Sequence, residues 1–146
     1  MAPERDRPDD RRRPDVEFCV HGRPLSARTR RRGSLAAWRQ QVRAVALAAL
    51  PDGHAPYAVA VELRITLYAP RPVADMDNLI KPVQDALQGI LYEDDRMVKD
   101  VSGNWRNIDA PFQLHAASDV LVIALGSRRQ FMHIRLWVAP VDEDLG

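Results

Sequence analysis

The sequence predicts an α+β fold in which a mixed β-sheet carries two helices on one face. The chain has 146 residues, which is enough for one domain with a buried core. Hydrophobic residues make up 46% of it, as is typical of a globular protein. Alternating and helical patterns of apolar residues follow one another in the order β-α-β-α-β-β-β, which favours a sheet covered by helices.

The first half of the chain should form a strand, a helix and a second strand. Residues 16–20 alternate in a β-prone run, and residues 21–34 then contain glycine, proline and five arginines, which favours a loop. Ser34 is a candidate N-cap for a helix whose apolar stripe is formed by Leu35, Trp38, Val42, Val45 and Leu50. Residues 57–69 alternate as a strand, with one face formed by Val59, Val61, Leu63, Ile65 and Leu67.

The second half should form one helix and three strands. Within residues 75–95, a helical stripe is formed by Leu79, Val83, Ala86 or Leu87, and Ile90. Pro82 cannot donate to the carbonyl of Asn78 and should distort the first turn, whereas Gly89 should end the helix in the C′ position. The remaining segments are expected to be strands, the last two forming a hairpin: 97–107, 119–125 and 131–138.

The two ends of the chain are expected to lie outside the core. Residues 1–14 are charged and proline-rich, so we expect a disordered tail before a single domain over residues 15–146, with 126–146 as a C-terminal extension. The tail is not followed by the apolar stretch of a secretory signal, and no apolar run approaches the ~20 residues of a membrane helix. The single cysteine, Cys19, has no disulfide partner, and we expect a small core residue in a reduced, cytoplasmic setting.

The net charge of +1 hides an uneven distribution. Residues 1–43 contain twelve arginines and six acidic residues, whereas residues 44–146 contain nine basic and fourteen acidic residues. A basic first part and an acidic remainder suit a protein that attracts a polyanion and also binds cations. A solvated tail beside an ordinary mixed surface would show the same distribution, so charge alone leaves nucleic-acid binding open.

Acidic residues crowd both ends of the second expected helix. Asp75 and Asp77 precede it in a segment that should be extended, where side chains two residues apart point the same way and their Cα atoms lie about 6–7 Å apart. Lys81 follows Asp77 by one helical turn and so lies on the same side. A return of the chain after the helix would bring Asp94 or Asp95 back to this group.

Three carboxylates brought together need a proton, a cation or more space. Two like charges 4 Å apart repel by roughly 4 kcal/mol at an effective dielectric constant of about 20. Oxygen ligands select hard ions such as Mg²⁺ or Mn²⁺ over zinc. With a lysine beside it, such an ion could bind a phosphate oxygen and stabilise developing charge. The acids therefore predict a metal site that acts on phosphate.

The same residues also have structural explanations. Asp77 alone is a good helix N-cap, Lys81 and Asp85 could form an i,i+4 surface pair, and residues 93–95 could be a solvated loop. The histidines are scattered without the spacing of metal ligands, so we expect structural or surface roles for His21, His54, His115 and His133.

The stretch D-M-D-N-L-I-K-P-V-Q-D-A-L-Q-G-I-L-Y-E-D-D, residues 75–95, resembles the signature of the RusA-type Holliday junction resolvases. These proteins share D-x-D-N-x-x-K, then D-A-L, then a glycine and a paired D-D. The stretch F-C-V-H-G-R-P-L-S, residues 18–26, resembles the family's first strand and its glycine–proline turn, and the similarity covers roughly residues 16–125. The chain departs from some members at Ala74, where they have a basic residue, and from many at Met97, where they have a glutamine.

The resemblance implies a RusA-like, homodimeric fold and an Mg²⁺-dependent endonuclease, with Mn²⁺ as a substitute ion, that resolves four-way DNA junctions by paired nicks. The implied catalytic residues comprise three metal-binding aspartates and one lysine: Asp75, Asp77, Asp95 and Lys81. Three further positions match the signature as supporting residues. Asn78 would shape the turn, Asp85 would orient Lys81, and Asp94 would be the less direct member of the acidic pair.

Other function classes remain open at this point. The chain could be a module of the same fold that holds branched DNA without cutting it, although such a module has no use for carboxylates facing phosphates. It could also be a metal-dependent hydrolase of small nucleotides, although a mononucleotide does not need a long basic surface. The arginines expected to contact DNA are Arg28, Arg30, Arg31, Arg32, Arg71 and Arg106. Trp105 is a candidate for stacking on a base.

Paired nicks require two sites, and a two-fold dimer would supply them. Apolar surfaces left uncovered after helix packing are candidate interfaces, namely the helix at 35–50 and the strand at 131–138. Phe131 and Trp137 lie on the strand face opposite its aliphatic residues. We therefore expect one of these strand faces to be covered by a partner or another layer.

Overall fold

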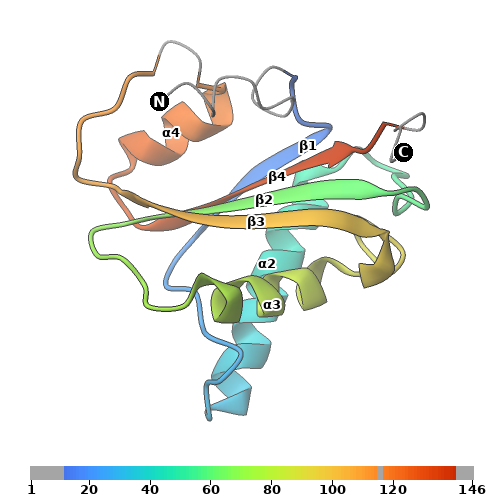
Figure 1. Ribbon diagram of the computed structural model, residues 1–146, viewed down its shortest axis with the longest axis horizontal. Helices are drawn as coiled ribbons and strands as arrows, with labels where there is room; N and C mark the ends of the chain where they lie inside the picture. The colour runs from blue at the N-terminus through green and yellow to red at the C-terminus, as the bar shows by residue number, and fades with distance from the viewer. Residues whose placement is uncertain (1–11, 115–116, 141–146) are drawn as a thin grey trace, which may run out of the picture.

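The computed structural model describes residues 12–114 and 117–140, which form a four-stranded mixed sheet with helices on both faces (Figure 1). The strands are β1 (Val16–His21), β2 (Val61–Ala69), β3 (Val98–Asn107) and β4 (Phe131–Val138). The helices are α2 (Arg32–Ala49), α3 (Met76–Leu87) and α4 (Asp119–Gly126). This architecture confirms the α+β class and the mixed sheet.

The order of strands across the sheet is β1-β4-β2-β3. Strand β4 lies antiparallel between β1 and β2, whereas β2 and β3 are parallel neighbours. A parallel pair needs a crossover, which α3 provides. The start of α3 therefore lies near the carboxyl ends of β2 and β3, and its end lies near the start of β3. In Figure 1, α3 runs back beneath β3 in this direction.

Helices α2 and α3 lie on one side of the sheet and α4 lies on the other (Figure 1). The larger hydrophobic cluster joins α2 and α3 to the sheet, and its fully buried members include Val42, Ile65, Leu87, Ile134 and Leu136. A smaller cluster on the other side contains Tyr68, Phe131 and Ala124 of α4, with the rings of Tyr68 and Phe131 stacked 4.8 Å apart. The central strand β4 is thus buried from both sides.

Helix α3 packs directly onto β3 because residue 103 is a glycine. A Cβ atom at Gly103 would lie 2.5 Å from Cδ1 of Ile80 and 3.2 Å from Cε of Met76. Any larger residue there would force the side chains of Ile80 and Met76 to shift.

Residues 119–125 form helix α4, so the expected strand and its hairpin with residues 131–138 are wrong. The segment is rich in β-branched residues, but Ser118 caps a helix by accepting a hydrogen bond from the N–H of Leu121 at 3.2 Å. Strand β4 obtains both of its partners from distant segments, β1 and β2. The local pattern could not indicate that choice.

Two expected element boundaries also differ. Helix α2 begins at Arg32, before the expected cap Ser34, and its N-cap residue Arg31 makes no side-chain capping bond. Val59 lies before β2 and is 47% exposed, so it does not belong to the buried face of the strand. Gly89 has φ +84° directly after the C-cap Gln88, which confirms its position at C′.

The expected tail at residues 1–14 lies mostly outside the described residues, as do residues 141–146 and His115. The indole N–H of Trp137 donates to the carbonyl of Arg12 at 2.9 Å, so the chain already lies against β4 at Arg12. Residues 131–138, which fall in the expected C-terminal extension, form β4, an interior strand of the sheet. Among the described residues, no helix is long and apolar enough to span a membrane.

Strand 131–138 cannot serve as the expected dimer interface. Phe131 is 0% exposed and Trp137 is 1% exposed, because both side chains are covered within the chain. The large exposed hydrophobic side chains on helices lie elsewhere, at Leu47 of α2 and at Val120, Val122 and Ile123 of α4.

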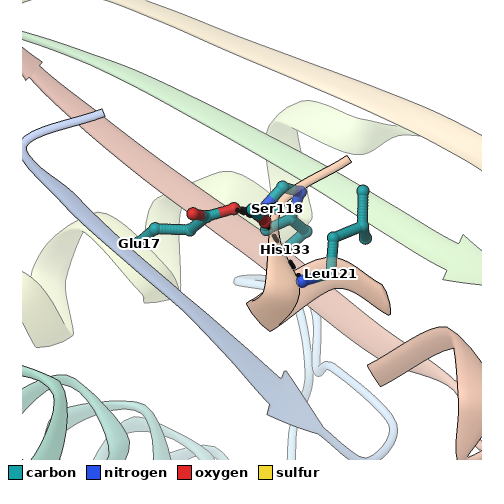
Figure 2. A network of polar contacts seen from close by, with 4 residues as sticks. All are labelled: Glu17, Ser118, Leu121 and His133. Atoms are coloured by element: carbon teal, nitrogen blue, oxygen red, sulfur yellow. Dashed lines mark hydrogen bonds and ion pairs between the residues drawn. The ribbon is translucent and has the colours of Figure 1, made fainter. Parts of the chain in front are cut away.

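A buried polar network attaches α4 to the sheet (Figure 2). Glu17 Oε2 lies 2.6 Å from His133 Nε2 and accepts a hydrogen bond from Ser118 Oγ at 2.6 Å. Burial alone would raise the pKa of Glu17, but the hydrogen bonds from His133 and Ser118 outweigh it and the pKa is lowered. Burial lowers the pKa of His133, against the influence of Glu17. The hydroxyl of Ser118 thus both caps α4 and donates a hydrogen bond to Glu17 of β1.

Ser118→Ala should lower the free energy of unfolding by about 1–2 kcal/mol, because it removes both the cap of α4 and a donor to a part-buried carboxylate. Urea denaturation at neutral pH measures this change. Ser34→Ala is the matched control, since Ser34 lies in the first turn of α2 without capping it. A loss of stability from Ser34→Ala equal to that from Ser118→Ala would contradict this assignment of the caps.

Candidate active site

The start of α3 is built around the carboxylate of Asp75. Asp75 is the N-cap: its Oδ1 accepts hydrogen bonds from the backbone N–H groups of Asp77 at 3.0 Å and Asn78 at 3.4 Å. Its Oδ2 accepts from the side-chain amide of Asn78 at 2.8 Å. Three donors thus fix the carboxylate in place. A carboxylate has about four lone-pair sites, so one remains for a cation.

Asp77 lies in the first turn of α3 rather than at the N-cap, which corrects its expected capping role. Its side chain is exposed, and within the described residues its carboxylate has neither a hydrogen bond nor an ion pair. Negative charge is favourable near a helix N-terminus, so the position suits an acidic side chain. Asp77 is therefore free to bind an external cation.

Pro82 does not break α3, but it changes the partner of one backbone carbonyl. Proline has no N–H to donate to the carbonyl of Asn78, four residues earlier. That carbonyl instead accepts a hydrogen bond from the N–H of Ala27 at 2.8 Å. The arginine-rich segment before α2 is thereby held against the first turn of α3.

Asp95 lies at the opposite end of α3. Its carboxylate is 3.0 and 3.1 Å from the side-chain nitrogen of the C-cap Gln88, in the amide orientation that satisfies both groups. Burial and the nearby charges of Asp85 and Asp94 raise the pKa of Asp95, while Lys81 acts in the opposite direction. Asp95 is thus a carboxylate whose negative charge is not fully compensated.

Lys81 and Asp85 lie between the two ends of the helix. Lys81 Nζ is 3.6 Å from Asp85 Oδ1, and the Lys81 side chain is 67% exposed. The other oxygen of Asp85 lies 3.6 Å from a guanidinium nitrogen of Arg39 on α2. Arg39 therefore shares Asp85 with Lys81 and leaves the lysine loosely held. Helical periodicity places Gln88 on the face of Asn78, Lys81 and Asp85, but the sequence indicates no role for Gln88 or Arg39, because their roles depend on how α2 and the loop after α3 pack.

Asp94 is occupied by its own neighbour in the chain. It caps the 3₁₀ turn Asp95–Met97 and accepts from the backbone N–H of Arg96 at 2.9 Å and from Arg96 Nε at 3.2 Å. These bonds, the backbone one above all, lower the pKa of Asp94. The two members of the acidic pair thus differ, and Asp95 is the one left for a cation.

The expected convergence of the three aspartates does not occur within one chain. Helix α3 has 12 residues, so at 1.5 Å per residue its ends lie about 18 Å apart. Asp75 and Asp77 lie at one end and Asp95 contacts the residue that caps the other. Among residues 12–114 and 117–140, no three His, Cys, Asp or Glu side chains form a group that could hold a metal ion.

The predicted DNA-binding arginines gather mainly at the Asp75 end. Arg71 follows β2 and Arg106 lies near the end of β3, where Tyr68 of β2 pairs with it. Arg28 follows Ala27, whose backbone N–H donates a hydrogen bond to the carbonyl of Asn78 in α3. The side chains at this end and at the start of α2 are exposed: Arg28, Arg30, Arg31, Arg32, Arg71 and Arg106.

Trp105 is not a free stacking platform. Its indole N–H donates to the carbonyl of Ala69 at 3.1 Å, and its ring packs against the larger hydrophobic cluster. It connects β3 to the end of β2 and so supports the backbone that carries Arg71 and Arg106.

A model of one protein family, described as endodeoxyribonuclease RusA, matches residues 19–111. No curated protein matches the chain. The matched span begins within β1 and ends after β3, so it contains every candidate residue at both ends of α3. Helix α4 and the central strand β4 lie beyond it.

Asp95→Asn should raise the unfolding midpoint by about 1–2 °C in low-salt buffer without divalent ions, because it removes a poorly compensated charge. The difference should shrink as pH falls through the raised pKa of Asp95, since the wild-type side chain is then neutral too. Asp94→Ala should instead lower the midpoint, because it removes a cap and a partner of Arg96. Thermal denaturation between pH 3 and pH 7 measures both; an equal effect of the two changes would contradict their assigned environments.

Proposed function

Because the chain belongs to the RusA endodeoxyribonuclease family, we propose that it is an Mg²⁺-dependent endonuclease that resolves four-way DNA junctions by paired nicks. Holliday junction resolution is the general activity that this family implies. The observation that carries the proposal is the arrangement on α3: an available carboxylate at each end, a loosely held lysine between them, and exposed arginines beside the first end.

Asp75, Asp77 and Asp95 are suited to hold the ion. Asp75 is oriented by three hydrogen bonds, and Asp77 has no partner within the described part of the chain. Burial and the negative charges of Asp85 and Asp94 raise the pKa of Asp95, and a cation would offset these charges. Oxygen ligands of this type favour Mg²⁺, with Mn²⁺ as a substitute. When bound, the ion would polarise the phosphate and lower the pKa of a water molecule.

The chain's own residues complete the proposed site. Lys81 keeps its ammonium within 3.6 Å of Asp85 yet largely exposed, so it can turn toward a phosphate and balance charge that develops during cleavage. Asp85 and Arg39 limit the positions that Lys81 occupies. Arg28, Arg71 and Arg106 would bind the DNA backbone and place it over the start of α3.

We further propose that the working enzyme is a homodimer with shared sites. Within one chain, Asp75 and Asp77 lie at the start of α3, whereas Asp95 contacts Gln88, the residue that caps its end. In a two-fold dimer whose axis crosses near the middle of α3, the two α3 helices run antiparallel, and the start of one lies beside the end of the other. Helix α3 and the edge strand β3 lie at the same margin of the sheet, which makes this approach feasible. Two equivalent sites result, as paired nicks require.

Asp77→Asn should reduce nicking of a synthetic four-way junction in Mg²⁺ by about 100-fold or more, because it removes a ligand from the ion. Junction affinity should stay equal or increase, since repulsion of phosphate falls. Gel assays of nicking and of binding measure the two effects. Asp119→Asn on α4 is the matched control and should nick at the wild-type rate. Nicking by the Asp77→Asn protein at that rate would exclude this site, and binding of the junction by wild-type protein without any nicking would favour a non-catalytic branched-DNA-binding protein.

A mixture of two inactive variants tests the shared sites. In a dimer of one Asp77→Asn chain and one Asp95→Asn chain, one shared site carries both changes and the other carries none. Mixing under conditions that allow subunit exchange should therefore restore single nicks but not paired ones. The matched control mixes Asp77→Asn with Asp75→Asn, which change the same end of α3 and should remain inactive. Absence of rescue in the first mixture would show that the sites are not shared in this way.

A further inference from the structure

The hydrogen bond between Ala27 and Asn78 links the arginine-rich loop to the acidic start of α3. In the described part of the chain, it is the backbone hydrogen bond that connects the loop between Gly22 and Arg31 to α3. In an ordinary helix, the Asn78 carbonyl would instead accept a hydrogen bond from the backbone N–H four residues later. Pro82 leaves that acceptor without its helical donor, and the N–H of Ala27 takes its place at 2.8 Å.

The loop at this point is a well-formed turn. The N–H of Thr29 donates to the carbonyl of Ser26 at 3.0 Å, and the N–H of Arg28 donates to Ser26 Oγ at 3.0 Å. Neither Ala27 nor Arg28 has a positive φ, so the turn is of the common type in which proline is favoured at the second position, here Ala27. The turn presents the exposed Arg28 side chain directly beside its attachment to α3.

Asn78 connects this turn to the candidate metal ligands. Its carbonyl accepts a hydrogen bond from the N–H of Ala27. Its side-chain amide donates to Asp75 Oδ2 at 2.8 Å, and its backbone N–H donates to Asp75 Oδ1. One residue therefore fixes both the carboxylate of Asp75 and the position of the turn. A phosphate bound by Arg28 would lie at a defined distance from that carboxylate only while both bonds are present.

We propose that Pro82 and the backbone N–H of Ala27 are positioning residues that set the arginine-bearing turn relative to the acidic end of α3. Pro82 acts by leaving the Asn78 carbonyl available, and Ala27 acts by binding it. Their common effect is to hold the DNA backbone beside Asp75 and Asp77. This inference rests on the proposed function, because it concerns where the substrate phosphate lies during cleavage.

Ala27→Pro tests the link by removing one donor. Proline suits this turn position, so the turn itself should persist while its bond to Asn78 is broken. Trypsin should then cleave faster after Arg28 and Arg30, because the turn is no longer hydrogen-bonded to the helix. Junction affinity should fall about 3- to 10-fold, and its log–log salt dependence should become shallower by about one unit for each arginine that no longer binds a phosphate. The nicking rate at saturating junction should also fall about 10-fold, because the phosphate is less well placed.

Pro82→Ala tests the same link from the other side. Alanine restores a helical N–H that competes with Ala27 for the Asn78 carbonyl, so amide hydrogen exchange at Ala27 should accelerate. The unfolding midpoint should rise, because proline is unfavourable inside a helix. Junction affinity should nevertheless fall. The double variant should bind no more than about 2-fold more weakly than Ala27→Pro alone, because both changes break one bond.

Ala27→Ser is the matched control, since it changes the side chain and keeps the N–H; it should bind and nick as the wild type does. Wild-type affinity, salt dependence and nicking rate in Ala27→Pro, with faster tryptic cleavage, would overturn the inference and leave the proposed function intact. Failure of the wild-type protein to bind the junction would instead refute the proposed function. If Ala27→Pro does not fold, Pro82→Ala decides: unchanged affinity together with faster exchange at Ala27 overturns the inference.

Discussion

The parallel pairing of β2 with β3 determines where the candidate residues on α3 and at its two ends lie. Because parallel neighbours cannot be joined by a tight turn, the chain must return along the sheet, and α3 makes that return. Residues that are close in the sequence are thereby placed at opposite ends of a 12-residue helix. The same pairing brings the carboxyl ends of two strands together and gathers arginines beside one acidic end. Separation of the acids and concentration of the arginines are two results of one topological constraint.

The two acidic ends differ in how far their charge is compensated. At the start of α3, hydrogen bonds and the helix terminus support Asp75 and Asp77. At the other end, burial and the charges of Asp85 and Asp94 raise the pKa of Asp95, while Arg96 donates hydrogen bonds to Asp94. The carboxylate of Asp75 is already oriented by hydrogen bonds, whereas the negative charge at Asp95 is not fully offset by nearby positive groups. A cation bound between the start of one α3 helix and the end of another would offset the negative charge at Asp95 without breaking the hydrogen bonds of Asp75.

Much of the fold could be predicted from periodicity, because β1, β2, α2, α3 and β4 each have an alternating or helical apolar pattern; β3 (VKDVSGNWRN) is an expected strand although its apolar residues do not alternate. Helix α4 could not be, since its β-branched residues favour a strand and its helical state depends on the Ser118 cap and on packing against β1. The motif identified the candidate site residues but not their separation, because spacing in the sequence does not reveal which strands pair. The contributions of Arg39, Gln88 and Ala27 also depend on tertiary contacts, and the local pattern, which places Gln88 on the polar face of α3, does not reveal what these residues contact.

The position of β4 has a consequence for how the molecule folds. Strand β1 has β4 as its neighbour in the sheet, and β2 needs β4 on its open side, yet β4 follows both of them by more than 60 residues in the sequence. Contacts between such distant segments form slowly, because a long loop must close before any pairing is gained. Until residues 131–138 have been synthesised, β1 and one edge of β2 lack partners and remain open to pairing with other chains. The strand outside the family match is therefore the one that protects the sheet from aggregation.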